Sequence, residues 1–173
     1  MNPQVVPPRL GRHVLIVVDA APCFVNCFRK VAATLTEIDK RNYTLIRCCP
    51  PVYWEHGGGE DPDTCAEIQG MWQQEESEFA RSREYLGKVK EILLEMGVPE
   101  DQIETRVATE QGSLVEATMT ELRNGHYSGV IVSGMHVDVV NRLLRRGLTD
   151  RFRSVPEVEV CEMRGEPAAQ SVI

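Results

Sequence analysis

The sequence has no long apolar run and no basic surplus, and its first residues do not resemble a signal peptide. Its apolar runs all fall short of the ~20 residues that span a membrane. Residues 1–8 are proline-rich and lack the charged-then-apolar layout of a signal peptide. A net charge of −7 leaves no basic stripe of the kind that binds nucleic acid. We therefore expect a cytoplasmic protein that binds neither membranes nor nucleic acid.

The six cysteines form no Cys-x-x-Cys pair, the spacing that many metal and redox sites use. A chain of 173 residues is long enough to build a hydrophobic core without disulfides. We therefore expect reduced, independent, structural thiols and no metal ligands. The alternative is a redox or metal site at one edge of the fold, built from Cys23, Cys27, Cys48 and Cys49.

Apolar runs and helical periodicity alternate along the chain and predict an α/β protein. Strands are expected at 13–18, 43–48, 103–108, 130–132 and 158–163. Helices are expected at 22–38, 73–96 and 113–125, with more helix after residue 134, and a long loop at about 50–70. The predicted domain covers 12–163, preceded by a loose N-terminal arm at 1–11 and followed by a disordered tail at 164–173.

This order of elements predicts a single five-stranded parallel sheet with helices on both faces, because right-handed crossovers leave few ways to wind it. Ligands of such sheets bind outside the carboxyl ends of the strands, at the point where the winding reverses. Asp19, Cys49 and Gly134 all stand at the carboxyl ends of predicted strands. The sequence therefore predicts a binding site at this edge of the sheet.

The stretch from Gly129 to Arg153 is predicted to form a strand, a turn, a helix, a second turn and a second helix. Gly134 and Gly147 allow the two turns, and His136 lies inside the first. Backbone amides at such turns attract anions, and five arginines against two aspartates between residues 137 and 155 give a local charge of +3. The alternative is an ordinary amphipathic helix with solvated arginines and an exposed turn histidine.

With these residues in place, the chain resembles the universal stress protein family from His13 to Met163. The resemblance lies in a strand that ends in Asp19, a strand that ends in Cys49-Pro50-Pro51, and the glycines. Nucleotide-binding members of the family carry Gly, two residues, Gly, nine residues, Gly and then Ser or Thr. The resemblance implies an adenine nucleotide alpha hydrolase-like fold with strand order 3-2-1-4-5 and a site for ATP or AMP.

The same resemblance implies which residues bind the nucleotide. Asp19 is expected near the adenosine, and Gly134 and Gly147 near the phosphates. The cofactor-binding residues that we expect are Asp19, Ala20, Cys49, Gly134, His136, Val137, Gly147 and Thr149. No metal is expected other than magnesium carried by the nucleotide.

The chain departs from the family pattern at two positions. Val137 stands where the middle glycine is expected, and Leu148 stands where the hydroxyl residue is expected. Thr149 replaces that hydroxyl only if the turn is one residue longer. Because a β-branched side chain at Val137 occupies space that phosphate oxygens need, we expect weaker nucleotide binding than in members with the complete motif.

Three hypotheses about function follow. The first is a nucleotide-binding protein of stress response or signalling, and the second is a dimerisation or adaptor module of the same fold that binds no nucleotide. The third is an enzyme, either a slow ATP hydrolase or a thiol-dependent one, although no general base stands beside the glycines. Val158, Val160 and Cys161 of the last strand predict a homodimer, since the resembled family commonly dimerises there.

Overall fold

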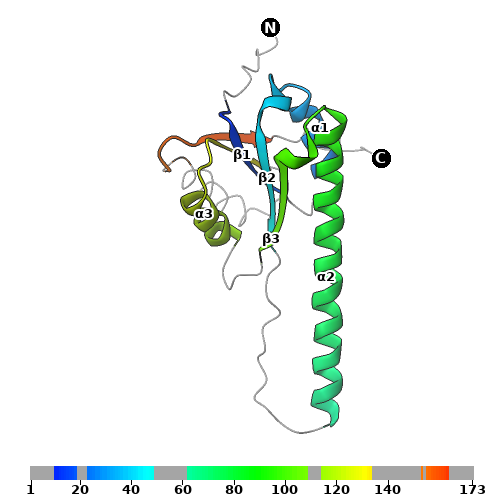
Figure 1. Ribbon diagram of the computed structural model, residues 1–173. Helices are drawn as coiled ribbons and strands as arrows, with labels where there is room; N and C mark the ends of the chain where they lie inside the picture. The colour runs from blue at the N-terminus through cyan, green and yellow to red at the C-terminus, as the bar shows by residue number, and fades with distance from the viewer. Residues whose placement is uncertain are drawn as a thin grey trace, which may run out of the picture.

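A five-stranded parallel sheet organises the molecule (Figure 1). The structure, a computed structural model, describes residues 10–18, 23–48, 62–108, 114–133, 153 and 155–163. The spatial order is β3-β2-β1-β4-β5. The strands are β1 (His13–Val17), β2 (Asn42–Cys48), β3 (Ile103–Ala108), β4 (Gly129–Ser133) and β5 (Glu159–Met163). The predicted parallel fold, its strand order and its five strands are confirmed.

Helices cover both faces of the sheet, with α1 and α2 on one face and α3 on the other (Figure 1). The helices are α1 (Phe24–Ala32), α2 (Pro62–Glu95) and α3 (Leu114–Asn124), with short 3-10 turns η1 (Ile38–Lys40) and η2 (Glu100–Gln102). Alternate strand residues point to opposite faces, so β1 contributes to two cores. The α1–α2 core contains Val14, Ile16, Phe24, Phe28, Tyr43, Leu45, Val89 and Leu93. The α3 core contains Leu15, Val17, Ile46, Met119, Leu122 and Val130.

The first helix is shorter than predicted, because α1 ends at Ala32 and not at Ile38. Beyond it the backbone tightens, and the N–H of Thr34 donates to the carbonyl of Val31 at 2.9 Å, three residues back. Thr34 also donates from its hydroxyl to the same carbonyl at 2.7 Å. Glu37 then takes a left-handed conformation with a φ of 52°, which no helix continues through. Local threonine hydrogen bonds therefore end the helix before its apolar periodicity does.

The long helix begins earlier than predicted, at Pro62 and not at Gln73. Pro62 and Asp63 are residue types common in turns, which agrees with the loop predicted at 50–70. Both also suit a first helical turn, since proline needs no hydrogen-bonded N–H there and an acidic side chain is favourable near a helix N-terminus. The predicted loop at 50–70 is therefore wrong from residue 62 onward, and Gly57–Gly59 lie outside the described residues.

The carboxyl end of α2 and the whole of α3 agree with the predictions. Gly97 follows α2 with a φ of 89°, and the N–H of Val98 donates to the carbonyl of Leu93 at 3.0 Å, a glycine-dependent helix end. In α3, Met119 and Leu122 are buried against the sheet as predicted. The helix predicted after residue 134 lies outside the described part of the chain.

Of the N-terminal segment expected to be loose, residues 1–11, the structure describes Leu10 and Gly11. Leu10 is 4% exposed, and its carbonyl accepts a hydrogen bond from Arg41 Nε at 3.0 Å. A Cβ at Gly129 would lie 2.6 Å from Leu10 Cδ2, so the glycine that opens β4 makes room for this leucine. Across the described residues, none of the helices is apolar enough over a sufficient length to cross a membrane.

Candidate functional site

The carboxyl edge of the sheet contains the point at which the winding reverses. From β1 the chain continues to β2 on one side, and from β4 it continues to β5 on the other. The two strands pair in parallel, with Ile16 level with Ile131. Two strands that lead away from each other leave a crevice between their carboxyl ends, which is where sheets of this kind bind ligands.

The strands that lead to this edge of the sheet are closely packed. Ile16, Ile131 and Val130 are fully buried, and Val17 and Val132 are at most 5% exposed. The N–H of Val18 still donates to Ile46 O at 2.8 Å, so the ladder continues to the last described residue of this segment. Close packing on both faces holds the strand ends at fixed positions relative to each other.

The predicted site residues all lie outside the described residues. They are Asp19, Ala20, Cys49, Gly134, His136, Val137, Gly147 and Thr149. The described strands nevertheless lead to three of them in sequence. Asp19 follows Val18, Cys49 follows Cys48 at the end of β2, and Gly134 follows Ser133 at the end of β4. Their contacts remain predictions.

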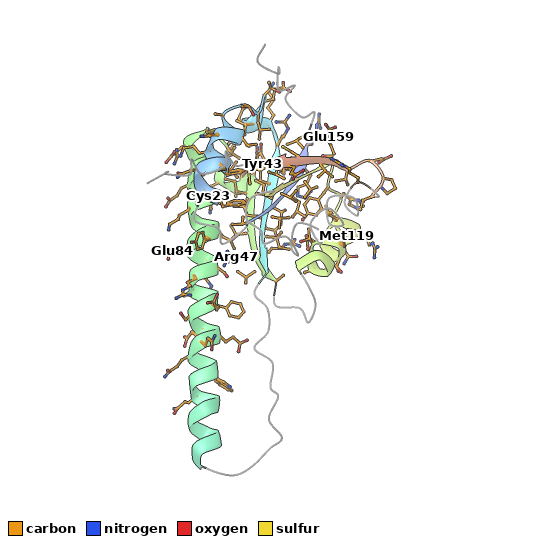
Figure 2. All side chains as sticks on the ribbon, turned by 180° about the vertical axis from the view of Figure 1, so that it is seen from behind. Cys23, Tyr43, Arg47, Glu84, Met119 and Glu159 are labelled. Carbon is orange, nitrogen blue, oxygen red and sulfur yellow. The ribbon has the colours of Figure 1, made fainter. Side chains whose placement is uncertain are left out.

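Arg47, which we did not predict, is a buried cation one residue from the end of β2. Its side chain is 8% exposed, and its Nε donates to Ser82 Oγ of α2 at 2.8 Å. Its guanidinium carbon lies 5.0 Å from the centre of the Tyr85 ring, a cation–π contact. Figure 2 shows Arg47 at the side of the sheet that faces α2.

None of the described carboxylates forms an ion pair with Arg47. Buried arginines are usually paired, because an isolated charge is costly to remove from water. Among the described residues, the guanidinium contacts one hydroxyl and one aromatic face, whereas an arginine carries five N–H donors. The sequence signal for this residue was available, since Arg47 interrupts the apolar run of a buried strand.

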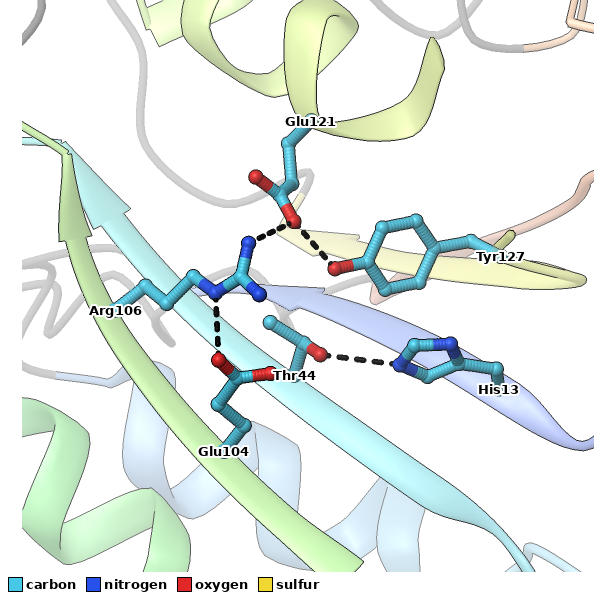
Figure 3. Close-up of polar contacts among 6 residues, drawn as sticks. All are labelled: His13, Thr44, Glu104, Arg106, Glu121 and Tyr127. Atoms are coloured by element: carbon cyan, nitrogen blue, oxygen red, sulfur yellow. Dashed lines mark hydrogen bonds and ion pairs between the residues drawn. The ribbon is translucent and has the colours of Figure 1, made fainter. Parts of the chain in front are cut away.

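A second polar group lies on the α3 face of the sheet (Figure 3). It joins His13, Thr44, Glu104, Arg106, Glu121 and Tyr127. Arg106 donates from Nε to Glu104 at 2.9 Å and from Nη1 to Glu121 at 2.7 Å. The Tyr127 hydroxyl donates to the same Glu121 oxygen at 2.5 Å, and His13 Nε2 lies 3.1 Å from Thr44 Oγ1.

Tyr127 and His13 of this network both favour their neutral forms. Burial, followed by the hydrogen bond to Glu121, raises the pKa of Tyr127 to about 12. Burial also lowers the pKa of His13, which is therefore neutral at pH 7. Arg106 is paired with two carboxylates. We interpret the network as a clamp that fixes α3 to the strands.

The sequence carried a partial signal for this clamp. Glu104 and Arg106 stand two apart in β3, which places both on one face of an edge strand. Their partner Glu121 comes from a helix, and its distance from them depends on how α3 crosses the sheet. A Cβ at Gly125 would lie 2.1 Å from Tyr127 Cε2, so glycine there is needed for the tyrosine to reach the network.

Among the described residues, no group of three or more His, Cys, Asp or Glu side chains is arranged to hold a metal ion. Burial raises the pKa of the Cys161 thiol, which favours its unreactive protonated form. Cys23 precedes α1 and Cys27 lies within it, whereas Cys49 lies outside the described residues. The thiol site that we considered as an alternative therefore gains no geometric support from the described part of the chain.

Solved structures provide an independent comparison. A universal stress protein from Archaeoglobus fulgidus, solved in complex with dAMP, superposes with a TM-score of 0.55 at 10% identity, over 89% of this chain and 98% of that one. A universal stress protein in complex with cAMP gives a TM-score of 0.55 at 12% identity, over 90% and 98%. Another structure from Archaeoglobus fulgidus gives 0.51 at 9% identity, over 90% and 95%. This chain has the universal stress protein fold.

No protein-family model and no curated protein sequence matches the chain. The universal stress protein fold predicted from the strand ends and glycines is nevertheless confirmed by the sheet order and by these superpositions. Within this fold, Arg47 contacts α2 on one face of the sheet, and the clamp around Arg106 contacts α3 on the other face. The two polar groups therefore occupy opposite faces of one sheet.

Proposed function

We propose that this chain binds an adenine nucleotide, ATP or AMP, at the carboxyl edge between β1 and β4, and acts in stress response or signalling. The reversal of winding between these strands carries the proposal. Two structures with the same fold were solved with cAMP and with dAMP. Arg47 adds a buried cation on the neighbouring strand, and a guanidinium pairs well with anionic phosphate.

In this proposal Asp19 and Ala20 bind the adenosine together with Cys49, and Gly134, His136, Gly147 and Thr149 surround the phosphates. Magnesium enters only with the nucleotide. Val137 restricts the approach of the phosphates to the backbone amides, because a β-branched side chain stiffens the turn and fills space. The protein then binds nucleotide more weakly than relatives with glycine at that position.

Isothermal titration with ATP and AMP tests the proposal directly. Asp19→Ala is expected to weaken binding, whereas Asp101→Ala, at an exposed acid in η2, leaves it unchanged. Val137→Gly is expected to strengthen binding by about ten- to a hundredfold, the value of one good phosphate contact. Equal affinities in all four proteins would contradict the site, and no binding by any of them would favour an adaptor.

An adaptor that binds no nucleotide is the second candidate, and two described features favour it. β5 forms an open edge of the described sheet, with Val158, Val160 and Cys161 only partly buried. A symmetric copy of that edge would make the predicted homodimer. Light scattering at tens of micromolar tests this, since a monomer there contradicts the dimer. The second feature is the amino half of α2, where Trp72 is exposed and available for a partner protein.

A further inference from the structure

The amino half of α2 extends away from the sheet (Figures 1 and 2). We call residues 62–81 of this 34-residue helix the arm. At a rise of 1.5 Å per residue the arm is about 30 Å long. Trp72 within it is 64% exposed, and residues 73–77 are exposed as well. The first fully buried side chain after the arm is Ser82, where α2 meets Arg47 of the sheet.

The arm continues the stripe by which α2 packs on the sheet. Trp72, Phe79, Leu86 and Leu93 follow one another at intervals of seven residues. Leu86 is 2% exposed and Leu93 is fully buried. Positions seven apart differ by about 20° around a straight helix, so Phe79 lies about 20° and Trp72 about 40° from Leu86, on the same side of the helix beyond the edge of the sheet. The apolar stripe of α2 therefore extends beyond the edge of the sheet that covers its carboxyl half.

Acidic side chains flank the exposed tryptophan. Glu75 and Glu76 are exposed and lie about 60° to one side and 40° to the other side of Trp72 around the helix. Over its length the arm carries five acidic residues and one arginine, a net charge of −4. That arginine, Arg81, already pairs with Glu78 at 3.1 Å. The apolar face of the arm is therefore set in a negative field.

This charge selects among occupants. Two arms laid side by side would place acid against acid, which is unfavourable in either direction. Nucleic acid and anionic membranes are repelled for the same reason. An amphipathic helix with lysine or arginine beside its apolar face would cover Trp72 and neutralise the glutamates at once.

We propose that the arm is a docking surface for a basic amphipathic helix of another protein. The apolar face of that helix packs on Trp72 and Phe79, and its cations meet Glu75 and Glu76. This inference goes beyond nucleotide binding and does not rest on it, because no arm residue belongs to the proposed nucleotide site.

Tryptophan fluorescence provides a direct readout. The chain has two tryptophans, so Trp54→Phe leaves Trp72 as the only one. The probe is a synthetic peptide of about 21 residues, with leucine at heptad a and d positions and lysine at e and g. The control peptide has glutamate in place of every lysine. The basic peptide is expected to shift Trp72 emission to shorter wavelength and to bind less tightly as salt is raised, and the acidic peptide is expected to cause no shift.

Matched variants locate the surface. In isothermal titration, Trp72→Ala is expected to weaken binding of the basic peptide at least about tenfold, since buried tryptophans dominate interfaces. Gln74→Ala is the control, because Gln74 is exposed and lies about 200° around the helix from Trp72. Glu75→Lys combined with Glu76→Lys is expected to abolish the preference for the basic peptide. AMP titration of the same variants should remain unchanged, which separates this proposal from the nucleotide site.

Three outcomes would overturn the proposal. The first is that both peptides bind with equal affinity, or that neither peptide binds. The second is an equal loss in Trp72→Ala and Gln74→Ala, which would indicate general unfolding of the arm, and circular dichroism of both variants detects it. The third is self-association in sedimentation velocity that Trp72→Ala removes, which would make a second copy the occupant.

Discussion

The carboxyl half of α2, residues 82–95, packs on the sheet, whereas the described side chains of the amino half, the arm, are largely exposed. The packed half contains three cations and three acids, and the arm has a net charge of −4. The packed half is also held by pairs to other elements, Arg29–Glu95 from α1 and Lys90–Glu100 from η2. One uninterrupted helix thus contains a segment stabilised by tertiary packing and a segment that depends on its own helix propensity.

The boundary between the two halves of α2 lies at Ser82, which accepts a hydrogen bond from Arg47 of β2. Toward the carboxyl end, the heptad stripe has the sheet as its partner, and it becomes core. Toward the amino end, the same stripe has no sheet beneath it, and Trp72 is exposed. Burial of a side chain is therefore decided by what lies opposite, and the stripe alone does not determine it.

The largest expected effect comes from removing one stripe residue in each half. Leu93→Ala should lower the free energy of unfolding by about 2 to 5 kcal/mol, because it leaves a cavity in the core. Trp72→Ala should change it by less than about 0.5 kcal/mol, since an exposed side chain makes little packing. Urea unfolding of both variants checks this. A large loss in Trp72→Ala would mean that the arm is packed and that the comparison fails.

The second largest effect is expected at alkaline pH, which should destabilise the sheet and leave the arm unaffected. Tyr127 titrates with a pKa of about 12 in the folded protein, and burial raises the pKa of Tyr43 as well, above the ordinary value near 10. A raised pKa means that the folded state favours the neutral phenol. The resulting stabilisation is present below about pH 10 and is lost as the pH rises toward about 12.

The arm has no tyrosine and should not respond. Near-ultraviolet absorbance follows the phenolates, and hydrogen exchange followed on arm and sheet peptides compares the two regions. Tyr127→Phe should shift the alkaline loss of stability to a different pH. An alkaline transition that begins in the arm would contradict the assignment.

A smaller effect is expected from the two glycines of α2. A Cβ at Gly70 or Gly87 would meet nothing within 4 Å, so alanine is tolerated at both. Gly87→Ala should raise the free energy of global unfolding by about 0.5 to 1 kcal/mol, because alanine loses less backbone entropy. Gly70→Ala should slow hydrogen exchange in the arm and leave global unfolding unchanged. Equal gains in urea unfolding would show that the arm unfolds with the core.

The smallest effect is expected from an exposed ion pair on the packed half. Lys88 donates to Glu84 at 2.7 Å, and this hydrogen bond lowers the pKa of Glu84. A carboxyl whose pKa is lowered on folding stabilises the folded protein at pH values above its unfolded pKa. This contribution disappears as the pH falls through the pKa of the folded protein. Lys88→Gln should therefore lower stability slightly at pH 7 and by less at pH 4, because the pair contributes only while Glu84 is charged and exposed pairs contribute little. Urea midpoints at pH 7 and pH 4 measure this effect. Lys40→Gln, which removes the exposed Lys40–Glu37 ion pair, is the matched variant.

The sequence by itself determined the elements whose residues carry their own signals. Continuous apolar runs placed β1 and β4, alternation placed β5, and Gly97 placed the end of α2. These elements follow from backbone sterics and local periodicity, which are visible within a few residues. Right-handed crossovers left few ways to wind them, and the resemblance to the universal stress protein family implied the strand order that the sheet shows.

Only the tertiary structure decided which faces are covered and which polar groups meet. Pro62 reads equally as a turn signal and as a first helical residue, and the helix that follows it extends past the sheet. Arg47 meets Ser82, and Arg106 meets Glu121, across distances in sequence that no local pattern spans. Burial and pairing depend on the surface opposite each side chain, and that surface exists only once separate elements have packed together.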